Sequence, residues 1–211
     1  MLALDQVSKR YGRKLVLDRV EQSFAPGLTL LTGPSGAGKS TLLRLLATAE
    51  APSGGRICWN GVALPRARTA LRRALGYAPQ AVDLPEDLTA REFGLHMAAL
   101  KGLDAREADR QFLALADAVG LHADANNRIA TYSGGMRRRL VLVQALLGRP
   151  ALLALDEPTA ELDRDSADRV SALIVSRARE AVVVMTTHLA DALAPRAAAV
   201  LRVTDGKVLP A

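Results

Sequence analysis

The segment Gly33-Pro34-Ser35-Gly36-Ala37-Gly38-Lys39-Ser40 is the most informative part of this 211-residue chain for its fold. Residues 27–32, directly before it, form an apolar run that is typical of a buried strand. Residues 39–49 place leucines at helical spacing. The loop between them is too rich in glycine for either regular element. The sequence therefore predicts a strand, a glycine-rich loop and a helix in direct succession.

This loop has the chemistry of a phosphate cradle. Glycines let successive backbone N–H groups point into one concavity, and the positive N-terminal end of the next helix adds to it. Lys39 is placed to reach the β- and γ-phosphates of a nucleotide, and the Ser40 hydroxyl to bind Mg²⁺. The alternative is a chance glycine turn ahead of a helix. The strand before the loop and the helix after it favour the nucleotide site.

A second pair of functional residues follows another apolar run. Residues 151–155 predict a buried strand that ends at Asp156 and Glu157. An aspartate at this place can hold the Mg²⁺ shell, and the adjacent glutamate can orient and deprotonate a water for attack on the γ-phosphate. The alternative is that two acids end a strand because strands end at the surface. Together with the phosphate loop, the catalytic interpretation is the stronger one.

The remaining pattern indicates an α/β fold. Residues 182–186 predict a further strand, residues 87–148 are mainly helical in spacing, and residues 1–32 suggest short strands. Asn60-Gly61 and Asp205-Gly206 predict two hairpins. Strands separated by helices imply a parallel sheet with crossover helices. We expect a P-loop NTPase with a mostly parallel RecA-like sheet, a small antiparallel β subdomain and an inserted helical subdomain.

Composition limits the compartment in which the protein is expected and the classes of partner that it can bind. The single cysteine, Cys58, excludes a disulfide framework and a cysteine-based zinc site. No apolar run reaches the roughly 18 residues that a membrane span needs, and no signal peptide is visible, so we expect a cytoplasmic protein. The formal charge of +6 suits nucleic acid, but three Phe, three Tyr and one Trp are too few for a base-stacking surface. We therefore expect no nucleic-acid partner.

A second glycine-rich helix start occurs at Ser133-Gly134-Gly135-Met136. It offers another exposed N–H cluster able to bind an anion, while Ser133 also suits an ordinary helix cap. At this motif the chain resembles the nucleotide-binding domain of ABC transporters, whose signature reads Leu-Ser-Gly-Gly-Gln. Tyr132 and Met136 depart from that pattern. Both departures, and the run Met136-Arg137-Arg138-Arg139-Leu140, resemble the branch that exports drugs, antibiotics and polysaccharides.

The resemblance spans nearly all 211 residues and implies further roles. Tyr11 matches the aromatic residue that stacks on adenine. Gln80 matches the glutamine that touches the metal shell and senses the membrane partner. His188 matches the switch histidine that contacts the γ-phosphate. The loop Ala160-Glu161-Leu162-Asp163 matches the segment that crosses the dimer interface, although the family usually has a small residue in place of Glu161. His96 and His122 match nothing and are interpreted as structural.

The resemblance thus implies the Mg²⁺-dependent, ATP-hydrolysing subunit of an exporter. Two copies, identical or different, would sandwich two ATP molecules and drive a transmembrane permease from the inner face of the cell membrane. The domain would comprise a core of residues 1–86 and 148–211 and a helical subdomain of residues 87–147. Glu157, His188, Lys39 and Gln80 would be catalytic, and Ser40, Gln80 and Asp156 would hold the metal. Nucleotide contacts would come from Tyr11, Gly33, Pro34, Ser35, Gly36, Ala37, Gly38, Lys39, Ser40, Thr41, Ser133, Gly134 and Gly135.

Two alternatives stay open. One is an ABC-type ATPase without a transport role, acting on DNA, ribosomes or iron–sulfur assembly. Such relatives carry long coiled coils, zinc inserts or two ATPase copies, and this chain shows none of these in its sequence. The other is a small P-loop kinase, but that alternative does not explain the signature motif or His188.

Overall fold

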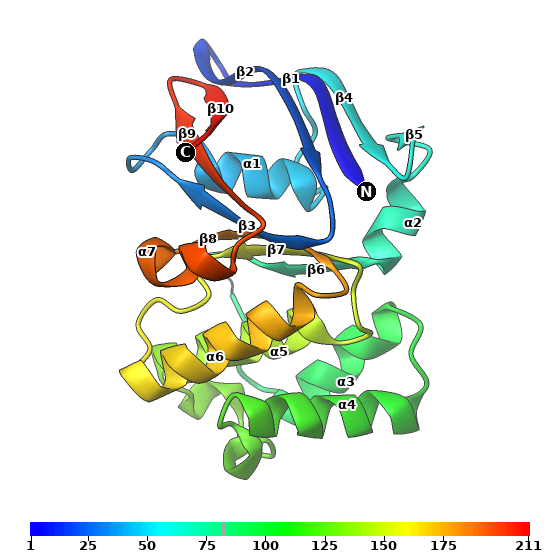
Figure 1. Cartoon of the computed structure of the whole chain (residues 1–211). Coiled ribbons are helices and arrows are strands. Elements are labelled where there is room, and N and C mark those ends of the chain that lie inside the picture. The colour runs from blue at the N-terminus through cyan, green and yellow to red at the C-terminus, as the bar shows by residue number, and fades with distance from the viewer. Residues whose placement is uncertain (82) are drawn as a thin grey trace.

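A six-stranded sheet lies at the centre of the molecule (Figure 1). The structure is a computed structural model that describes residues 1–81 and 83–211. The strand order is β10-β9-β3-β8-β7-β6, and all neighbours are parallel except β10 and β9. The strands are β3 (Gly27–Thr32), β6 (Leu75–Ala78), β7 (Leu152–Asp156), β8 (Val182–Thr186), β9 (Ala199–Thr204) and β10 (Lys207–Pro210). The predicted α/β fold with a mostly parallel sheet is confirmed.

Both faces of this sheet are buried, which explains its continuous apolar runs. Successive side chains of a strand point to opposite faces. In β7, Leu153 and Leu155 therefore join one hydrophobic cluster, whereas Leu152 and Ala154 join another. The sheet thus separates two hydrophobic cores, each of which is closed by a different layer.

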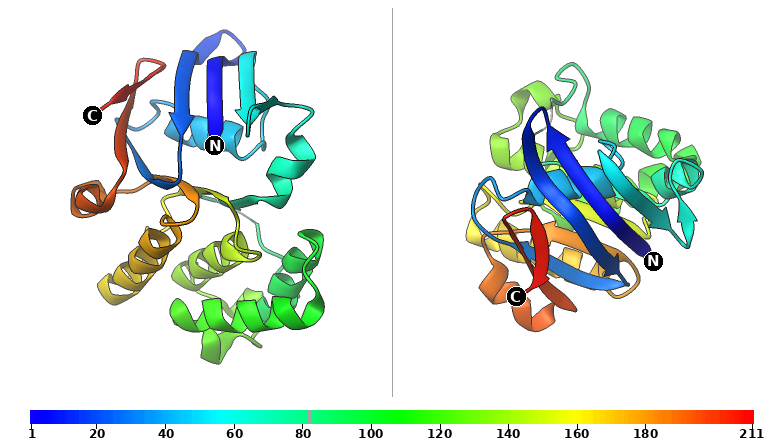
Figure 2. Two further views of the ribbon diagram at one scale, coloured as in Figure 1. Left: turned by 45° about the vertical axis from the view of Figure 1, so that its right-hand side comes forward. Right: turned by 90° about the horizontal axis from the view of Figure 1, so that it is seen from above.

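An antiparallel sheet closes the core that contains Leu152 and Ala154. Its order is β2-β1-β4-β5, formed by β1 (Leu2–Tyr11), β2 (Lys14–Phe24), β4 (Gly54–Trp59) and β5 (Val62–Ala63). Figure 2 shows this sheet above α1 (Lys39–Leu46), with α2 (Arg68–Arg73) at its side. The strands β1 and β2 have 10 and 11 residues, so the expectation of short strands there was wrong. The reason is that they form one long hairpin over α1.

Helices close the other core, which contains Leu153 and Leu155, on the opposite side of the central sheet (Figure 1). They are α3 (Ala90–Leu100), α4 (Ala105–Ala118), α5 (Gly134–Leu146) and α6 (Arg164–Arg177), with short 3₁₀ turns at His122–Asp124 and Ile129–Thr131. Of these, α6 comes after residue 147 but lies beside the others (Figure 1). The division at residues 87 and 147 stays a prediction. The chain ends with α7 (Ala190–Leu193), a 3₁₀ turn at Ala194–Arg196 and the β9–β10 hairpin.

The turns follow the sequence chemistry closely. Asn60-Gly61 joins β4 to β5 and Asp205-Gly206 joins β9 to β10, all four with positive φ, as predicted. By contrast, α1 ends at Leu46, whereas the sequence predicted a helix to residue 49. Thr48 has a φ of 55°, which is not helical, so the helix cannot continue through it. Among the described residues, no helix is both long enough and apolar enough to cross a membrane.

Candidate functional site

The loop after β3 forms one wall of a cavity of about 640 Å³. Predicted site residues that line this cavity are Tyr11, Gly33, Ser35, Gly36, Gly38, Lys39, Ser40, Thr41, Gln80, Asp156, Glu157 and His188. Lining residues that the sequence did not single out are Lys14, Val16, Leu31, Thr32, Thr187 and Ala190. Four parallel strands, β3, β6, β7 and β8, end at this edge of the sheet, and their following segments meet there.

Three glycines of the loop, Gly33, Gly36 and Gly38, have positive φ and let it curve. Gly33 has a φ of 128°, and a Cβ there would collide with the carbonyl oxygen of Val203. Gly38 has a φ of 107° at the N-cap of α1 and brings no side chain to cap the helix. The first turn of α1 also contains no acidic residue. Its N–H groups and positive helix end are therefore available to an anion in the cavity.

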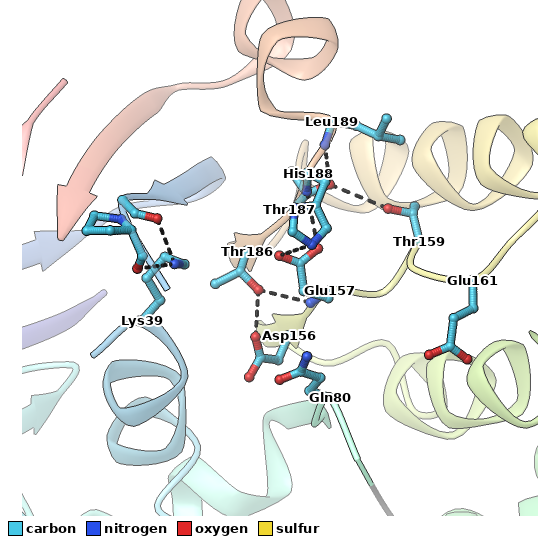
Figure 3. A network of polar contacts seen from close by, with 12 residues as sticks. Lys39, Gln80, Asp156, Glu157, Thr159, Glu161, Thr186, Thr187, His188 and Leu189 are labelled. Atoms are coloured by element: carbon cyan, nitrogen blue, oxygen red, sulfur yellow. Dashed lines mark hydrogen bonds and ion pairs between the residues drawn. The ribbon is translucent and has the colours of Figure 1, made fainter. Parts of the chain in front are cut away.

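Lys39 is held inside the loop. Its Nζ donates to the carbonyl oxygens of Gly33, at 2.8 Å, and Pro34, at 2.9 Å (Figure 3). Pro34 and Ala37 belong to the loop but are not among the residues that line the cavity. The ammonium group thus lies at the wall of the cavity, where it offers a point charge to a phosphate.

A buried threonine connects the two acids at the end of β7. Thr186 Oγ1 donates to Asp156 Oδ1 at 2.6 Å and accepts from the backbone N–H of Glu157 at 2.9 Å (Figure 3). All three residues are at most 8% exposed. Buried polar groups are stable when they are hydrogen-bonded in this way. One hydroxyl therefore fixes both the carboxylate of Asp156 and the backbone of Glu157.

The backbone of Glu157 has a φ of 51°, a left-handed conformation that non-glycine residues rarely adopt. His188 donates its backbone N–H to Glu157 Oε2 at 3.2 Å, and His188 Nε2 lies 3.6 Å from Glu157 Oε1. The histidine side chain is 85% exposed and the glutamate side chain 11%. Strain of this kind clusters at functional sites. The glutamate is thus a nearly buried carboxylate whose direction is set by its backbone and by the His188 loop.

Tyr11 lies at another side of the cavity. Its hydroxyl donates to Glu50 Oε2 at 2.6 Å, and Lys9 Nζ lies 5.0 Å from its ring centroid. Burial acts to raise the pKa of Glu50, but the hydrogen bonds from Lys9 and Tyr11 outweigh it and hold this pKa below its usual value. The ionised carboxylate fixes a half-exposed ring at the rim, where a flat base can stack on it.

The second glycine-rich motif lies apart from this cavity. Ser133, Gly134 and Gly135 are not among the lining residues. Ser133 is the N-cap of α5 and accepts from the N–H of Met136 at 3.3 Å. Ser133 and Gly134 are exposed. The motif is therefore an open helix start at the surface, which this chain does not combine with its own phosphate loop.

Sequence reasoning missed the threonines that organise the site. Thr187 Oγ1 accepts from the N–H of Leu189 at 3.0 Å and lies 3.4 Å from Thr159 Oγ1. Together with Thr186, these side chains tie the loop after β7 to the loop after β8. A polar residue directly after an apolar run is the only signal that points to them, and it is common at strand ends.

Comparisons with known proteins agree on one family. Residues 17–160 match the ABC transporter family. The Nod factor export ATP-binding protein I of Rhizobium etli is 35% identical over 90% of this chain and 62% of its own length. The protein of the same name in Burkholderia thailandensis is 38% identical over 88% of this chain and 62% of its own length. The chain thus spans about three fifths of these relatives.

Solved structures give the same result. A dimeric ATP-binding cassette in a post-hydrolysis state, bound to ADP and Pi, superposes with a TM-score of 0.88 at 25% identity, covering 99% of this chain and 96% of that chain. The ATP-binding subunit of an ABC transporter superposes with a TM-score of 0.88 at 27% identity, covering 99% of this chain and 88% of that chain. With its glycine loop, its two acids and its histidine around one cavity, the chain belongs to the ABC transporter family.

Proposed function

We propose that this chain binds and hydrolyses ATP as the ATPase subunit of an exporter. One observation carries the proposal: Lys39 and the loop around it share a single cavity with Asp156, Glu157 and His188. These are the groups that phosphoryl transfer to water requires, namely a phosphate cradle, a point charge and a base. The relatives named for Nod factor export support the export role.

The geometry supports distinct roles for these residues. Glu157 accepts a proton from the water that attacks the γ-phosphorus, while the bond from that phosphorus to the β-bridging oxygen breaks and ADP leaves. Its low exposure and its fixed backbone keep the carboxylate directed into the cavity. Lys39 and His188 stabilise the negative charge that spreads over the phosphate oxygens in the transition state.

The donor set also fits Mg²⁺. The Ser40 hydroxyl, the Asp156 carboxylate and the Gln80 amide oxygen are hard oxygen ligands that line the same cavity. Within the described residues no cluster of three or more His, Cys, Asp or Glu side chains forms a metal site. Mg²⁺ at nucleotide sites is commonly held by few protein ligands together with phosphate oxygens and water. When bound, the ion neutralises the phosphate charge.

We propose further that two chains combine around ATP. The open start of α5 at Ser133, Gly134 and Gly135 presents unused helix N–H groups to the surface, where they suit the γ-phosphate bound in another chain. The solved cassette in its post-hydrolysis state is itself dimeric. Each chain then supplies a phosphate loop to one site and a signature motif to the other.

The membrane partner is proposed to dock in an apolar groove. This groove has a volume of about 380 Å³ and lies where the end of β6 meets α3 and α5. Leu84, Phe93, Met97 and Val141 are among its lining residues. An apolar segment of a permease at the inner face of the cell membrane fits this groove, because a contiguous apolar hollow rimmed by polar groups is typical of an interaction site.

Co-purification with a permease tests this function. The permease to test is one encoded by a neighbouring gene whose product has about six apolar stretches of roughly 20 residues. A Met97→Glu chain places a charge in the groove and should lose the permease, while its own ATP turnover stays near the wild-type rate. Leu100→Glu is the matched control on the same helix, because Leu100 is 70% exposed and does not line the groove. Equal retention of both variants would contradict docking in this groove.

A further inference from the structure

The three consecutive arginines at the start of α5 reach three different parts of the molecule. Arg137 donates to the carboxylate of Glu86 at 2.7 Å. Arg139 donates to the carbonyl oxygens of Val119 and Gly120, both at 3.0 Å, and so ties α5 to the end of α4. These two arginines hold helices and loops of the same layer. The arginine between them reaches the candidate site instead.

Arg138 connects two loops with one guanidinium group. Its Nη1 donates to the backbone carbonyl of Gln80 at 2.9 Å, and its Nη2 donates to Glu161 Oε1 at 3.3 Å. The arginine side chain is only 13% exposed, whereas that of Glu161 is 64% exposed. An ion pair with an exposed carboxylate adds little to stability. The gain in stability is therefore a poor explanation for the ion pair with Glu161.

The Gln80 end of this connection lies at the nucleotide cavity. Gln80 follows β6, and its side chain lines the cavity together with that of Asp156 (Figure 3). A hydrogen bond to its backbone carbonyl restricts how the loop can turn and therefore where the amide points. Arg138 thus controls the direction of a proposed metal ligand without touching the cavity itself.

The Glu161 end lies against the signature motif. A Cβ on Gly134 would lie 3.1 Å from Glu161 Oε2, and a Cβ on Gly135 would lie 3.3 Å from the Glu161 carbonyl oxygen. The backbone of Glu161 has a φ of 62°, so a non-glycine residue holds a left-handed conformation here. The glutamate therefore packs directly on the two glycines that would receive a phosphate from the partner chain.

We propose that Arg138 is a positioning residue that joins the two ATP sites of a dimer. Through Gln80 it acts on the cavity of its own chain, and through Glu161 it acts on the signature motif that serves the other chain's ATP. This inference rests on the proposed two-chain sandwich. A planar guanidinium suits the task, because its fork holds two acceptors in fixed relative positions. A movement of either loop is then transmitted to the other, and the coupling is reciprocal for binding.

A mixed dimer tests each end separately. A Ser133→Arg chain keeps its phosphate loop and a Lys39→Ala chain keeps its signature motif, so their heterodimer has one complete site. Arg138→Met in the Ser133→Arg chain disturbs only the Gln80 end of that site. Arg138→Met in the Lys39→Ala chain disturbs only its Glu161 end. We expect ATP turnover to fall roughly tenfold in both placements, as when one charge-assisted hydrogen bond no longer positions a reacting group.

Arg137→Met is the matched control, because it removes the same charge from the same turn of α5. It should change turnover by less than about twofold in either chain, since its partners are the exposed carboxylate of Glu86 and the carbonyl oxygen of Tyr132, and neither residue lines the nucleotide cavity. Thermal unfolding should be similar for both methionine variants. A loss in only one placement, or equal losses for Arg137→Met, would overturn the joining role. If the Ser133→Arg and Lys39→Ala chains, with Arg138 intact, form heterodimers that do not hydrolyse ATP, the two-chain sandwich is wrong. This inference is then wrong with it.

Discussion

The two glycine-rich helix starts of this chain use the same physical device and differ in what surrounds it. At the start of α1 the N-cap residue is Gly38, which is buried and has no side chain to cap the helix. The ammonium group of Lys39 lies in the same loop. The start of α5 is capped by the hydroxyl of Ser133, is exposed, and has the carboxylate of Glu161 beside Gly134. Both present backbone N–H groups to an anion.

The difference shows which site is complete within one chain. The phosphate loop lies in one cavity with Asp156, Glu157 and His188, so it has all the groups for chemistry nearby. The α5 start has an open anion site but does not line that cavity: Arg139 donates to the carbonyl oxygen of Gly135 at 3.4 Å, and the carboxylate of Glu161 lies beside Gly134. One region is therefore suited to catalysis, and the other to recognising a phosphate that another chain presents.

The largest effect should come from the base at the complete site. Glu157→Gln keeps the shape of the side chain but cannot accept a proton from water. ATP turnover should fall roughly 10²- to 10⁴-fold, while ATP binding persists and an ATP-bound dimer accumulates. Steady-state kinetics, nucleotide titration and sizing chromatography with ATP measure these three properties. Turnover at the wild-type rate would remove Glu157 from the mechanism.

The second effect separates the α5 start from an ordinary cap. As a cap alone, Ser133→Ala should cost about 1 kcal/mol of unfolding free energy and leave turnover largely intact. As a phosphate ligand for the other chain, the same variant should lose most of its turnover with a similar small change in stability. Chemical denaturation and ATPase kinetics on the same sample distinguish the two. Full turnover in Ser133→Ala would reduce this region to a structural role.

A third effect concerns the charge at the α1 start. Lys39→Ala removes the ammonium that meets the β- and γ-phosphates. ATP affinity should fall by roughly 1.5–3 kcal/mol, the range for a lost charged hydrogen bond, which is about ten- to a hundredfold. Calorimetric titration with ATP gives the affinity directly, and Lys207→Ala is the control, because Lys207 pairs with Asp18 and does not line the cavity. Unchanged binding in Lys39→Ala would contradict the assignment of the phosphate loop.

The smallest effect comes from the far end of α5. Lys101 Nζ donates to the last carbonyl oxygens of this helix, those of Gln144 and Ala145 at 3.2 Å and Leu147 at 2.8 Å. Burial lowers the pKa of Lys101 from 10.5 to about 8. The unfolded chain then binds more protons than the folded chain between these values, so stability rises with pH across this window.

We expect the contribution of Lys101 to the free energy of unfolding to increase by about 1 kcal/mol from pH 8 to pH 9. The measurement is urea unfolding of the wild type and of Lys101→Met at each pH. The stability of the wild type relative to the variant should increase with pH. A difference that stays constant across this range would show that Lys101 keeps an ordinary pKa.

Much of the fold was accessible to sequence reasoning because it depends on local chemistry. The spacing of glycines in residues 33–38 needs backbone conformations that are decided within the loop. The pairs Asn60-Gly61 and Asp205-Gly206 specify their own turns in the same way. The strand β6 was missed, since its four residues, Leu75–Ala78, are too few to show a period.

Sequence patterns alone identified the phosphate loop, the two acids at the end of β7 and the family, because these depend on short segments whose chemistry needs no distant partner. The bridge of Thr186 between Asp156 and Glu157, and the contacts of Arg138 with Gln80 and Glu161, became visible only in the folded chain. The physical reason is strand order. Because β7 pairs with β8 on one side and with β6 on the other, loops that are far apart in the chain meet at one edge of the sheet. No local pattern of residues encodes which strands are neighbours.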